Sequence, residues 1–268
     1  MLTGLRQVNI ELTSRCDRHT LCAFCGHQDR KTNPNLQFGD MDFKLLYSIY
    51  EQIAPPIVAS FHRDGDPLVY PSLGEALYLF KEFPVSIVTH GEALNRRADD
   101  IIDKCTTVTV SVIPNDPDRD IQLASIAGFL RKKGALRPMF QLKFVGAIEP
   151  KAVIEYEKFG VPIIGRALHS KKGSFLYHRI EPAVPEIRVC LDFLGNPTVD
   201  WRGRVFACNR LDTESRGQIG DLNEQSLDEI WNGPVRQAML QAHLAGRRDL
   251  ANNLCKACTF WGIPTPAG

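Results

Sequence analysis

Short apolar stretches alternate with amphipathic stretches along the first two thirds of the chain. The apolar stretches are rich in β-branched and aromatic residues, which is typical of buried strands. They predict strands at residues 8–12, 57–61, 85–89, 107–113, 139–145 and 162–164. Between them, apolar positions at helical spacing predict helices at residues 41–53, 72–83, 93–104, 119–133 and 150–159.

Strands that alternate with helices in this way run parallel, with right-handed crossovers. The expected fold is α/β, a partial (β/α)6 barrel similar to a TIM barrel, with its site at the carboxyl ends of the strands. The alternation stops in a loop-rich stretch that begins near His169. We therefore predict two domains, residues 1–180 and 181–268. The second is expected to be a small module, with a hairpin at residues 198–206 and a helix from Ser226.

The chain contains eight cysteines at uneven intervals. In a reducing compartment, clustered cysteines are typically metal ligands or catalytic groups. Three on one loop suit an iron–sulfur cubane with one open iron, whereas structural zinc takes four ligands. Four cysteines near the C-terminus suit either zinc or a cluster. The N-terminal set is Cys16, Cys22 and Cys25, the C-terminal set is Cys190, Cys208, Cys255 and Cys258, and Cys105 stands apart.

Charge and hydropathy argue against several classes of protein, although a neutral total charge does not exclude a local basic patch. The net charge is +1, so no polyanionic partner is indicated and nucleic-acid binding is not expected. No apolar stretch reaches the length of about 18 residues that a membrane span needs. Residues 1–8 lack the apolar core of a signal peptide. We expect a cytoplasmic protein without a membrane partner.

The segment from Glu11 to Gly26 resembles the cluster loop of the radical S-adenosylmethionine superfamily. Five residues separate its first two cysteines, where three are usual. The resemblance implies a [4Fe–4S] cluster on the three N-terminal cysteines. Its open iron would bind S-adenosylmethionine, whose reductive cleavage gives a 5′-deoxyadenosyl radical. Phe24 matches the aromatic position beside the adenine, although a buried loop anchor explains it equally well.

Later segments match the superfamily's cofactor loops. Asp64-Gly65-Asp66-Pro67 resembles a Gly-Gly-Glu-Pro motif, which implies contact with the ammonium group of S-adenosylmethionine; an ordinary turn is the alternative. His90 lies where an asparagine is usual. The remaining candidates are Ser111 and Arg166 for the cofactor, and Arg166, Lys143 and Cys105 for catalysis. Each also has an interpretation without function: Ser111 as a core hydroxyl with its hydrogen bonds made, and Arg166 as an ordinary surface charge.

Residues 190–258 resemble the auxiliary-cluster module called SPASM or, in shortened form, Twitch. The match consists of Cys-x12-Gly-x4-Cys, a Gly-Asp-Leu segment, a Ser-Leu-x-x-Ile-Trp helix and a closing Cys-x2-Cys. It implies a second, fully ligated [4Fe–4S] cluster. In length, in this single auxiliary cluster and in its C-terminal pattern, the chain is similar to the 2-deoxy-scyllo-inosamine dehydrogenases.

This resemblance favours dehydrogenation of an alcohol group in a small molecule, sugar or cyclitol, with the auxiliary cluster taking the electron. An external donor of flavodoxin or ferredoxin type is the expected partner. The alternative is an epimerase or isomerase acting on a sugar, nucleoside or peptide, with Cys105 as its unassigned hydrogen donor. A peptide is less favoured, because the chain begins close to its first strand and leaves no room for a recognition domain. A non-catalytic protein with two zinc sites is the alternative of another class.

Overall fold

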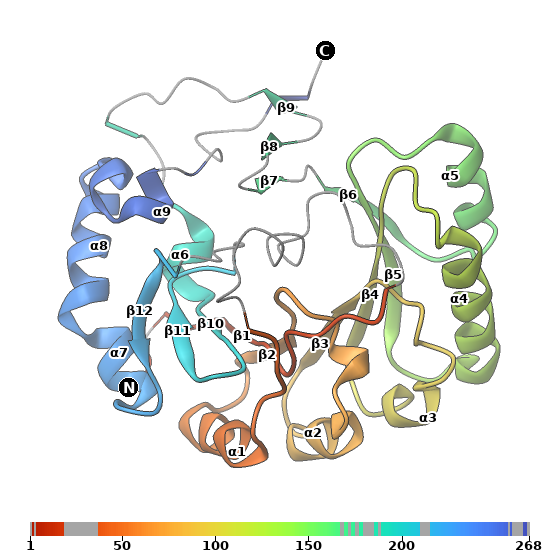
Figure 1. Cartoon of the computed structure of the whole chain (residues 1–268), viewed down its shortest axis with the longest axis horizontal. Helices are drawn as coiled ribbons and strands as arrows, with labels where there is room; N and C mark the ends of the chain where they lie inside the picture. The colour runs from red at the N-terminus through yellow and green to blue at the C-terminus, as the bar shows by residue number, and fades with distance from the viewer. Residues whose placement is uncertain are drawn as a thin grey trace.

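The computed structural model describes most of the chain and shows a strongly curved sheet with helices along its outer side (Figure 1). The described residues are 2, 4–18, 37–166, 169–170, 173–174, 177–178, 185–186, 189–209, 215–256, 258 and 265–266. None of the helices in these ranges is long and apolar enough to cross a membrane.

All six predicted parallel strands are present. They are β1 (Gln7–Ile10), β2 (Val58–Phe61), β3 (Val85–Thr89), β4 (Thr107–Val112), β5 (Met139–Val145) and β6 (Ile163–Arg166). Each pairs in parallel with the next in chain order. The predicted partial barrel is therefore confirmed.

The crossover helices cover the convex side of the sheet. They are α1 (Phe43–Gln52), α2 (Leu73–Leu79), α3 (Ala98–Ile101), α4 (Arg119–Lys133) and α5 (Pro150–Glu157). Asp42 caps α1 by accepting a hydrogen bond from the backbone N–H of Lys44. The helix α3 is much shorter than the predicted 93–104. The preceding residues form turns instead, and the backbone N–H of Asn95 donates to the Ser125 hydroxyl of α4 at 3.1 Å.

The parallel strands present an apolar face to the helices and a mixed, largely polar face to the inside of the curve. Val8, Ile10 and Phe61 belong to the hydrophobic core, and the Phe61 ring packs edge-on against Phe80 next to α2. The inner face carries polar side chains that lie side by side across neighbouring strands. They form a row of Thr198, Asn9, Ser60, Ser86 and Thr107, followed by the pairs Thr109–Gln141 and Ser111–Lys143.

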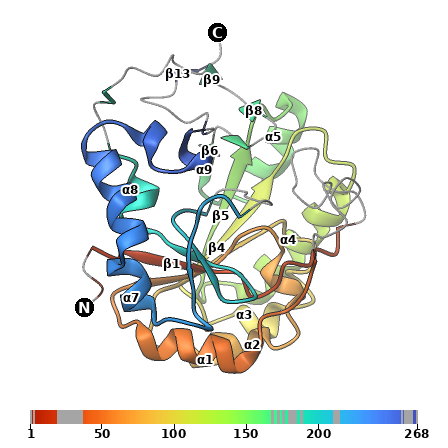
Figure 2. The same cartoon turned by 60° about the vertical axis from the view of Figure 1, so that its left-hand side comes forward.

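The C-terminal hairpin continues the same sheet. It consists of β10 (Thr198–Val199) and β11 (Arg204–Phe206), with Gly203 at its turn in the left-handed region at φ 95°. The strand β10 pairs in parallel with β1, and β12 (Gln218–Asp221) follows β11, which gives a nine-stranded sheet of order β12-β11-β10-β1-β2-β3-β4-β5-β6. Figure 2 shows the hairpin beside β1.

Short helices complete this C-terminal part. They are α6 (Leu191–Gly195), α7 (Leu227–Asn232), α8 (Pro234–Leu244) and α9 (Asn253–Lys256), with a short 3-10 turn η3 (Arg248–Leu250). Another 3-10 turn, η2 (Pro67–Val69), lies in the barrel between β2 and α2. The helix α7 begins after Ser226, as predicted, with a reciprocal capping box to Glu229. Two-residue strands β7 (His169–Ser170), β8 (Gly173–Ser174), β9 (Tyr177–His178) and β13 (Thr265–Pro266) pair outside the main sheet. The boundary near residue 180 stays a prediction, while side chains from both parts share one core.

Candidate active site and iron–sulfur ligands

The loops that follow β1, β2 and β3 meet at the carboxyl edge of the sheet. The backbone N–H of Asp66 donates to the carbonyl of Arg15 at 2.8 Å, next to Cys16. The backbone N–H of Asp64 donates to Glu11 Oε1 at 3.2 Å. The fold therefore joins the predicted cluster loop to the predicted cofactor loop, as their positions after neighbouring strands suggest.

Gly65 lies where this contact is closest. A Cβ atom at this position would lie 2.1 Å from the carbonyl oxygen of Thr13 and 2.7 Å from that of Arg15. Both are backbone atoms and cannot rotate away. The glycine of the Asp-Gly-Asp-Pro motif is thus required for the two loops to touch.

Asp66 connects the ends of β2 and β3 and is almost fully buried. Its Oδ1 accepts from the backbone N–H of Leu68 at 2.8 Å, which caps η2. Its Oδ2 accepts from the Thr89 hydroxyl at 2.7 Å and from the backbone N–H of His90 at 2.8 Å. Both carboxylate oxygens thus join the loop after β2 to the end of β3, at the place where the resemblance implies a cofactor contact.

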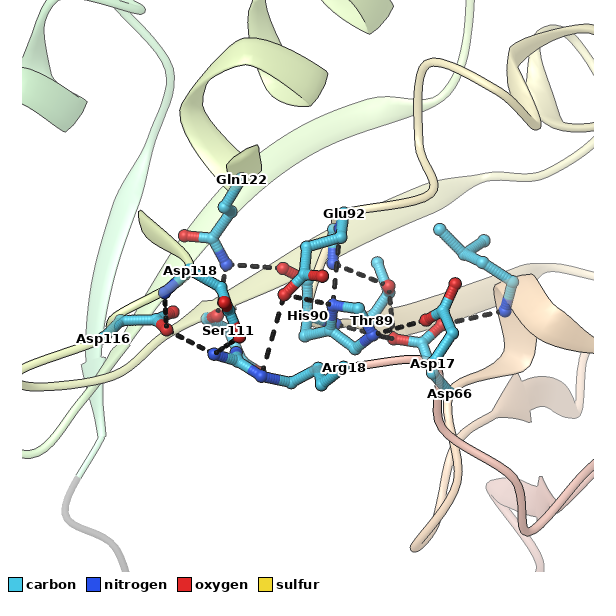
Figure 3. Close-up of polar contacts among 12 residues, drawn as sticks. Asp17, Arg18, Asp66, Thr89, His90, Glu92, Ser111, Asp116, Asp118 and Gln122 are labelled. Carbon is cyan, nitrogen blue, oxygen red and sulfur yellow. Dashed lines mark hydrogen bonds and ion pairs between the residues drawn. The ribbon is translucent and has the colours of Figure 1, made fainter. Parts of the chain in front are cut away.

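His90 places a positive charge beside Cys16. Burial lowers the pKa of His90, but the charge of Asp66 and hydrogen bonds with Asp17 and Cys16 outweigh it and raise the pKa to about 11. Its Nε2 lies 3.1 Å from Asp17 Oδ1 (Figure 3), and this hydrogen bond is the main reason that the pKa of Asp17 falls to about 2. The histidine is thus in contact with one of the predicted iron ligands, whose thiolate form is the one that binds iron.

Arg18 anchors the cysteine loop to the ends of β3 and β4. Its side chain is 2% exposed and forms ion pairs with Asp116, with Asp118 at 3.5 Å and with Glu92 at 3.7 Å. Figure 3 shows the guanidinium group reaching these carboxylates from the Cys16 segment. Arg18 belongs to the five residues between the first two cysteines, so this anchor lies within the predicted cluster loop itself.

The remaining predicted residues occupy different parts of the sheet. Ser111 and Lys143 are neighbours on β4 and β5, and Gln122 of α4 donates to the Ser111 carbonyl at 3.1 Å. Arg166 ends β6. Cys105 lies before β4, at the edge opposite Cys16, and burial raises the pKa of its thiol to about 12. The structure does not bring Cys105 to the carboxyl edge.

Glu11 joins three segments, and its role was not predicted. Its Oε1 accepts from Asp64 and its Oε2 from the backbone N–H of Trp201 at 3.4 Å, across 190 residues of sequence. Burial is the main cause that raises the pKa of Glu11 to about 8, against the lowering effect of Arg63. The nearby charges of Asp64 and Asp200 raise it further.

We expect the stability of the protein to fall as the pH rises toward 8. Folded Glu11 keeps its proton up to a pH of about 8, whereas unfolded Glu11 loses it near the ordinary value of 4.5. The folded state therefore binds more protons in this window, and stability decreases with pH. Glu11→Gln mimics the protonated form. Between pH 6 and 8, the free energy of unfolding of the native protein should fall by roughly 2 to 3 kcal/mol relative to the variant.

Urea titrations at several pH values measure this difference. The exposed Glu157 provides the matched control, since Glu157→Gln should leave the pH dependence unchanged. Parallel curves for the native protein and Glu11→Gln would contradict the elevated pKa of Glu11.

The C-terminal cysteines lie next to α6, β11 and α9. Cys190 directly precedes α6, Cys208 follows β11, and Cys255 belongs to α9, where its carbonyl accepts from the N–H of Cys258 at 3.1 Å. None of the cysteines in the described ranges is in a disulfide. Within those ranges, no three histidine, cysteine, aspartate or glutamate side chains are gathered closely enough to hold a metal ion. The ligand set stays a prediction, which the four thiols fit by their chemistry.

Three predicted site residues lie outside the described residues: Cys22, Phe24 and Cys25. The side chain of Arg166 is likewise not described. Of the three predicted N-terminal ligands, Cys16 is the one that the described residues include. It is a free, partly exposed thiol beside the imidazolium of His90.

The cysteine-bearing C-terminal part matches a known iron–sulfur domain, and the fold as a whole is similar to solved structures. Residues 190–259 match the family model of SPASM, an iron–sulfur cluster-binding domain. This match contains all four C-terminal cysteines, so the predicted module is confirmed. No curated protein matches the sequence.

Solved structures confirm the fold. The chain is similar to BtrN in an open conformation, with a TM-score of 0.59 and 19% identity over 96% of this chain and 94% of BtrN. BtrN in complex with AdoMet and 2-DOIA gives a TM-score of 0.58 and 18% identity over 95% and 92% of the two chains. Streptococcus suis SuiB bound to the precursor peptide SuiA gives 0.57 and 11% identity, over 96% of this chain and 71% of SuiB.

Proposed function

We propose that the protein is a radical S-adenosylmethionine oxidoreductase that removes hydrogen from a polar small molecule. The observation that carries this proposal is the union of three loops at the carboxyl ends of β1, β2 and β3. They are the loops of Cys16, Gly65 and His90, and hydrogen bonds join them. Their sequences are the ones that resemble the cluster loop and the cofactor loops of that superfamily.

Cys16, Cys22 and Cys25 would hold the first [4Fe–4S] cluster, and the Asp64–Asp66 loop and Ser111 would contact S-adenosylmethionine. When bound, the two cofactors supply a 5′-deoxyadenosyl radical that abstracts a hydrogen atom. His90 lies beside Cys16 and forms a hydrogen bond with its side chain. Arg18 and Gly65 keep the loop in place, one through buried ion pairs and the other through its close approach.

The inner face of the sheet favours a polar substrate. Its polar side chains are mostly hydroxyls and amides, with apolar ones such as Val88 between them, and the buried ammonium of Lys143 lies beside Ser111. Such groups bind hydroxyl, amine or carboxylate groups by hydrogen bonds and would leave an apolar molecule with unpaired polar atoms. The likeness to BtrN, whose structure holds 2-DOIA, agrees with a small polar substrate.

An alcohol is the substrate group we propose. Cys190, Cys208, Cys255 and Cys258 would hold a second cluster, whose contribution is to accept the electron left on the substrate. The match of residues 190–259 to an iron–sulfur domain supports this assignment. An external donor of flavodoxin or ferredoxin type would supply the electron for each cleavage of S-adenosylmethionine.

Epimerisation or isomerisation is the second candidate. The likeness to SuiB, whose structure holds a precursor peptide, keeps a peptide substrate open. Simple epimerisation requires a thiol that returns hydrogen to the substrate. Cys105 is buried at the opposite edge of the sheet, which disfavours it for that role.

Purification without oxygen followed by reduction tests the proposal. The protein should be brown and should convert S-adenosylmethionine to methionine and 5′-deoxyadenosine. Cys22→Ala should reduce this cleavage to background, because its cluster loses a ligand. Cys255→Ala should retain cleavage and stop formation of the oxidised product.

Cys105→Ala is the matched control, since it removes a buried cysteine outside both ligand sets and should keep both activities. A colourless protein that binds zinc would overturn the proposal. Product formation by Cys255→Ala would defeat the role of the second cluster as electron acceptor.

A further inference from the structure

A buried histidine lies against the C-terminal cysteines. His243 is on α8 and is 3% exposed. Its ring stacks on Phe193 of α6, with ring centroids 4.3 Å apart and planes at 5°. Phe193 is three residues after Cys190, so the stack places the imidazole among residues that carry the predicted ligands.

The stack fixes the direction of the imidazole edge. His243 Nε2 lies 3.8 Å from Cys255 Sγ, which is within hydrogen-bond distance for sulfur. In the described part of the chain, the Nδ1 atom on the other side of the ring is buried and has no hydrogen-bond partner. Cys255 is therefore the partner that the ring can use.

Iron binding decides which way this hydrogen bond runs. A cysteine that binds iron is a thiolate and has no proton to donate. The hydrogen must then lie on His243 Nε2, and the imidazole must donate to the sulfur. Hydrogen bonds to cluster sulfurs stabilise the reduced state, which carries more negative charge, and so raise the reduction potential.

We propose that His243 is a positioning residue that donates a hydrogen bond to the Cys255 thiolate and raises the reduction potential of the auxiliary cluster. This inference rests on one part of the proposed function, namely that Cys255 and the other three C-terminal cysteines bind a cluster. It adds a reason why that cluster accepts an electron from the substrate. The nitrogen acts through the sulfur and does not touch the substrate.

Redox titration followed by electron paramagnetic resonance tests the proposal on the full-length chain. Replacing Cys16, Cys22 and Cys25 by alanine removes the ligands of the first cluster, so the resonance signal comes from the auxiliary cluster. In this background, His243→Phe keeps a flat ring against Phe193 and removes the donor. We expect reduction to become about tenfold less favourable, which corresponds to about 59 mV for a one-electron couple.

His243→Gln retains an amide N–H and should restore part of the shift, which a merely structural role would not do. Pulsed resonance should detect a weak coupling of a histidine nitrogen to the cluster, and His243→Phe should remove it. An unchanged potential in His243→Phe, with iron content retained, would overturn the inference alone. A strong coupling typical of a nitrogen ligand would overturn it as well. Absence of any cluster in the background chain would overturn the auxiliary-cluster assignment and the inference with it.

Discussion

Gly65→Ala is expected to reduce the cleavage of S-adenosylmethionine by about 100-fold or more, because displacement of a reacting group by about 1 Å has effects of this size. The added Cβ would lie 2.1 Å from the Thr13 carbonyl oxygen and 2.7 Å from that of Arg15. Since both contacts are with backbone, the cofactor loop must move away from the cysteine loop. The hydrogen bond from Asp66 N–H to the Arg15 carbonyl would be lost with it.

Chromatographic assay of 5′-deoxyadenosine measures this effect. Gly165 is the matched control, because a Cβ there meets no atom within 4 Å and Gly165→Ala should retain the activity. The iron content of Gly65→Ala is expected to stay at or above that of the auxiliary cluster, since the C-terminal cysteines lie elsewhere. Full activity in Gly65→Ala would show that the two loops are not in contact in the working enzyme.

Arg18→Ala is expected to lower the free energy of unfolding by about 3 to 5 kcal/mol, the usual cost of breaking a buried ion pair. The Arg18 side chain is 2% exposed, and its partners Asp116, Asp118 and Glu92 are 2%, 10% and 8% exposed. Without the guanidinium group, three carboxylates would remain close together with little solvent. The cysteine loop would also lose its anchor to β3 and β4, so the first cluster should be occupied less fully.

Urea denaturation of the purified protein measures the stability. Arg96 is a suitable control, because it pairs with Asp17 in the same loop but is 67% exposed. Arg96→Ala should cost no more than about 1 kcal/mol. Equal costs for the two variants would mean that the buried position of Arg18 does not matter. A normal iron content in Arg18→Ala would contradict its role as the loop anchor.

The sequence alone determined the parallel strands and most of the helices. Buried parallel strands produce apolar stretches with β-branched residues, and the bounds predicted for α4, residues 119–133, are the observed ones. The grouping of the cysteines indicated metal ligands. The Asp64–Pro67 segment joined the candidate site through its resemblance to a cofactor loop of the superfamily. The predicted helix at residues 93–104 is longer than the observed α3 (Ala98–Ile101). At its start, the backbone N–H of Asn95 donates to the Ser125 hydroxyl of α4, a tertiary contact that the local spacing of apolar residues does not indicate.

Only the tertiary structure decided which distant residues meet. The pairing of β10 with β1, the junction of Glu11 with Trp201 and the anchoring of Arg18 by Asp116 and Asp118 join segments far apart in the sequence. His243 is likewise an ordinary helix residue until α8 packs beside Phe193. A charged or aromatic residue has many possible partners along a chain, and the neighbouring sequence does not indicate which of them it contacts in the fold. The partner is selected when folding removes water from around the group and leaves few neighbours that can satisfy it.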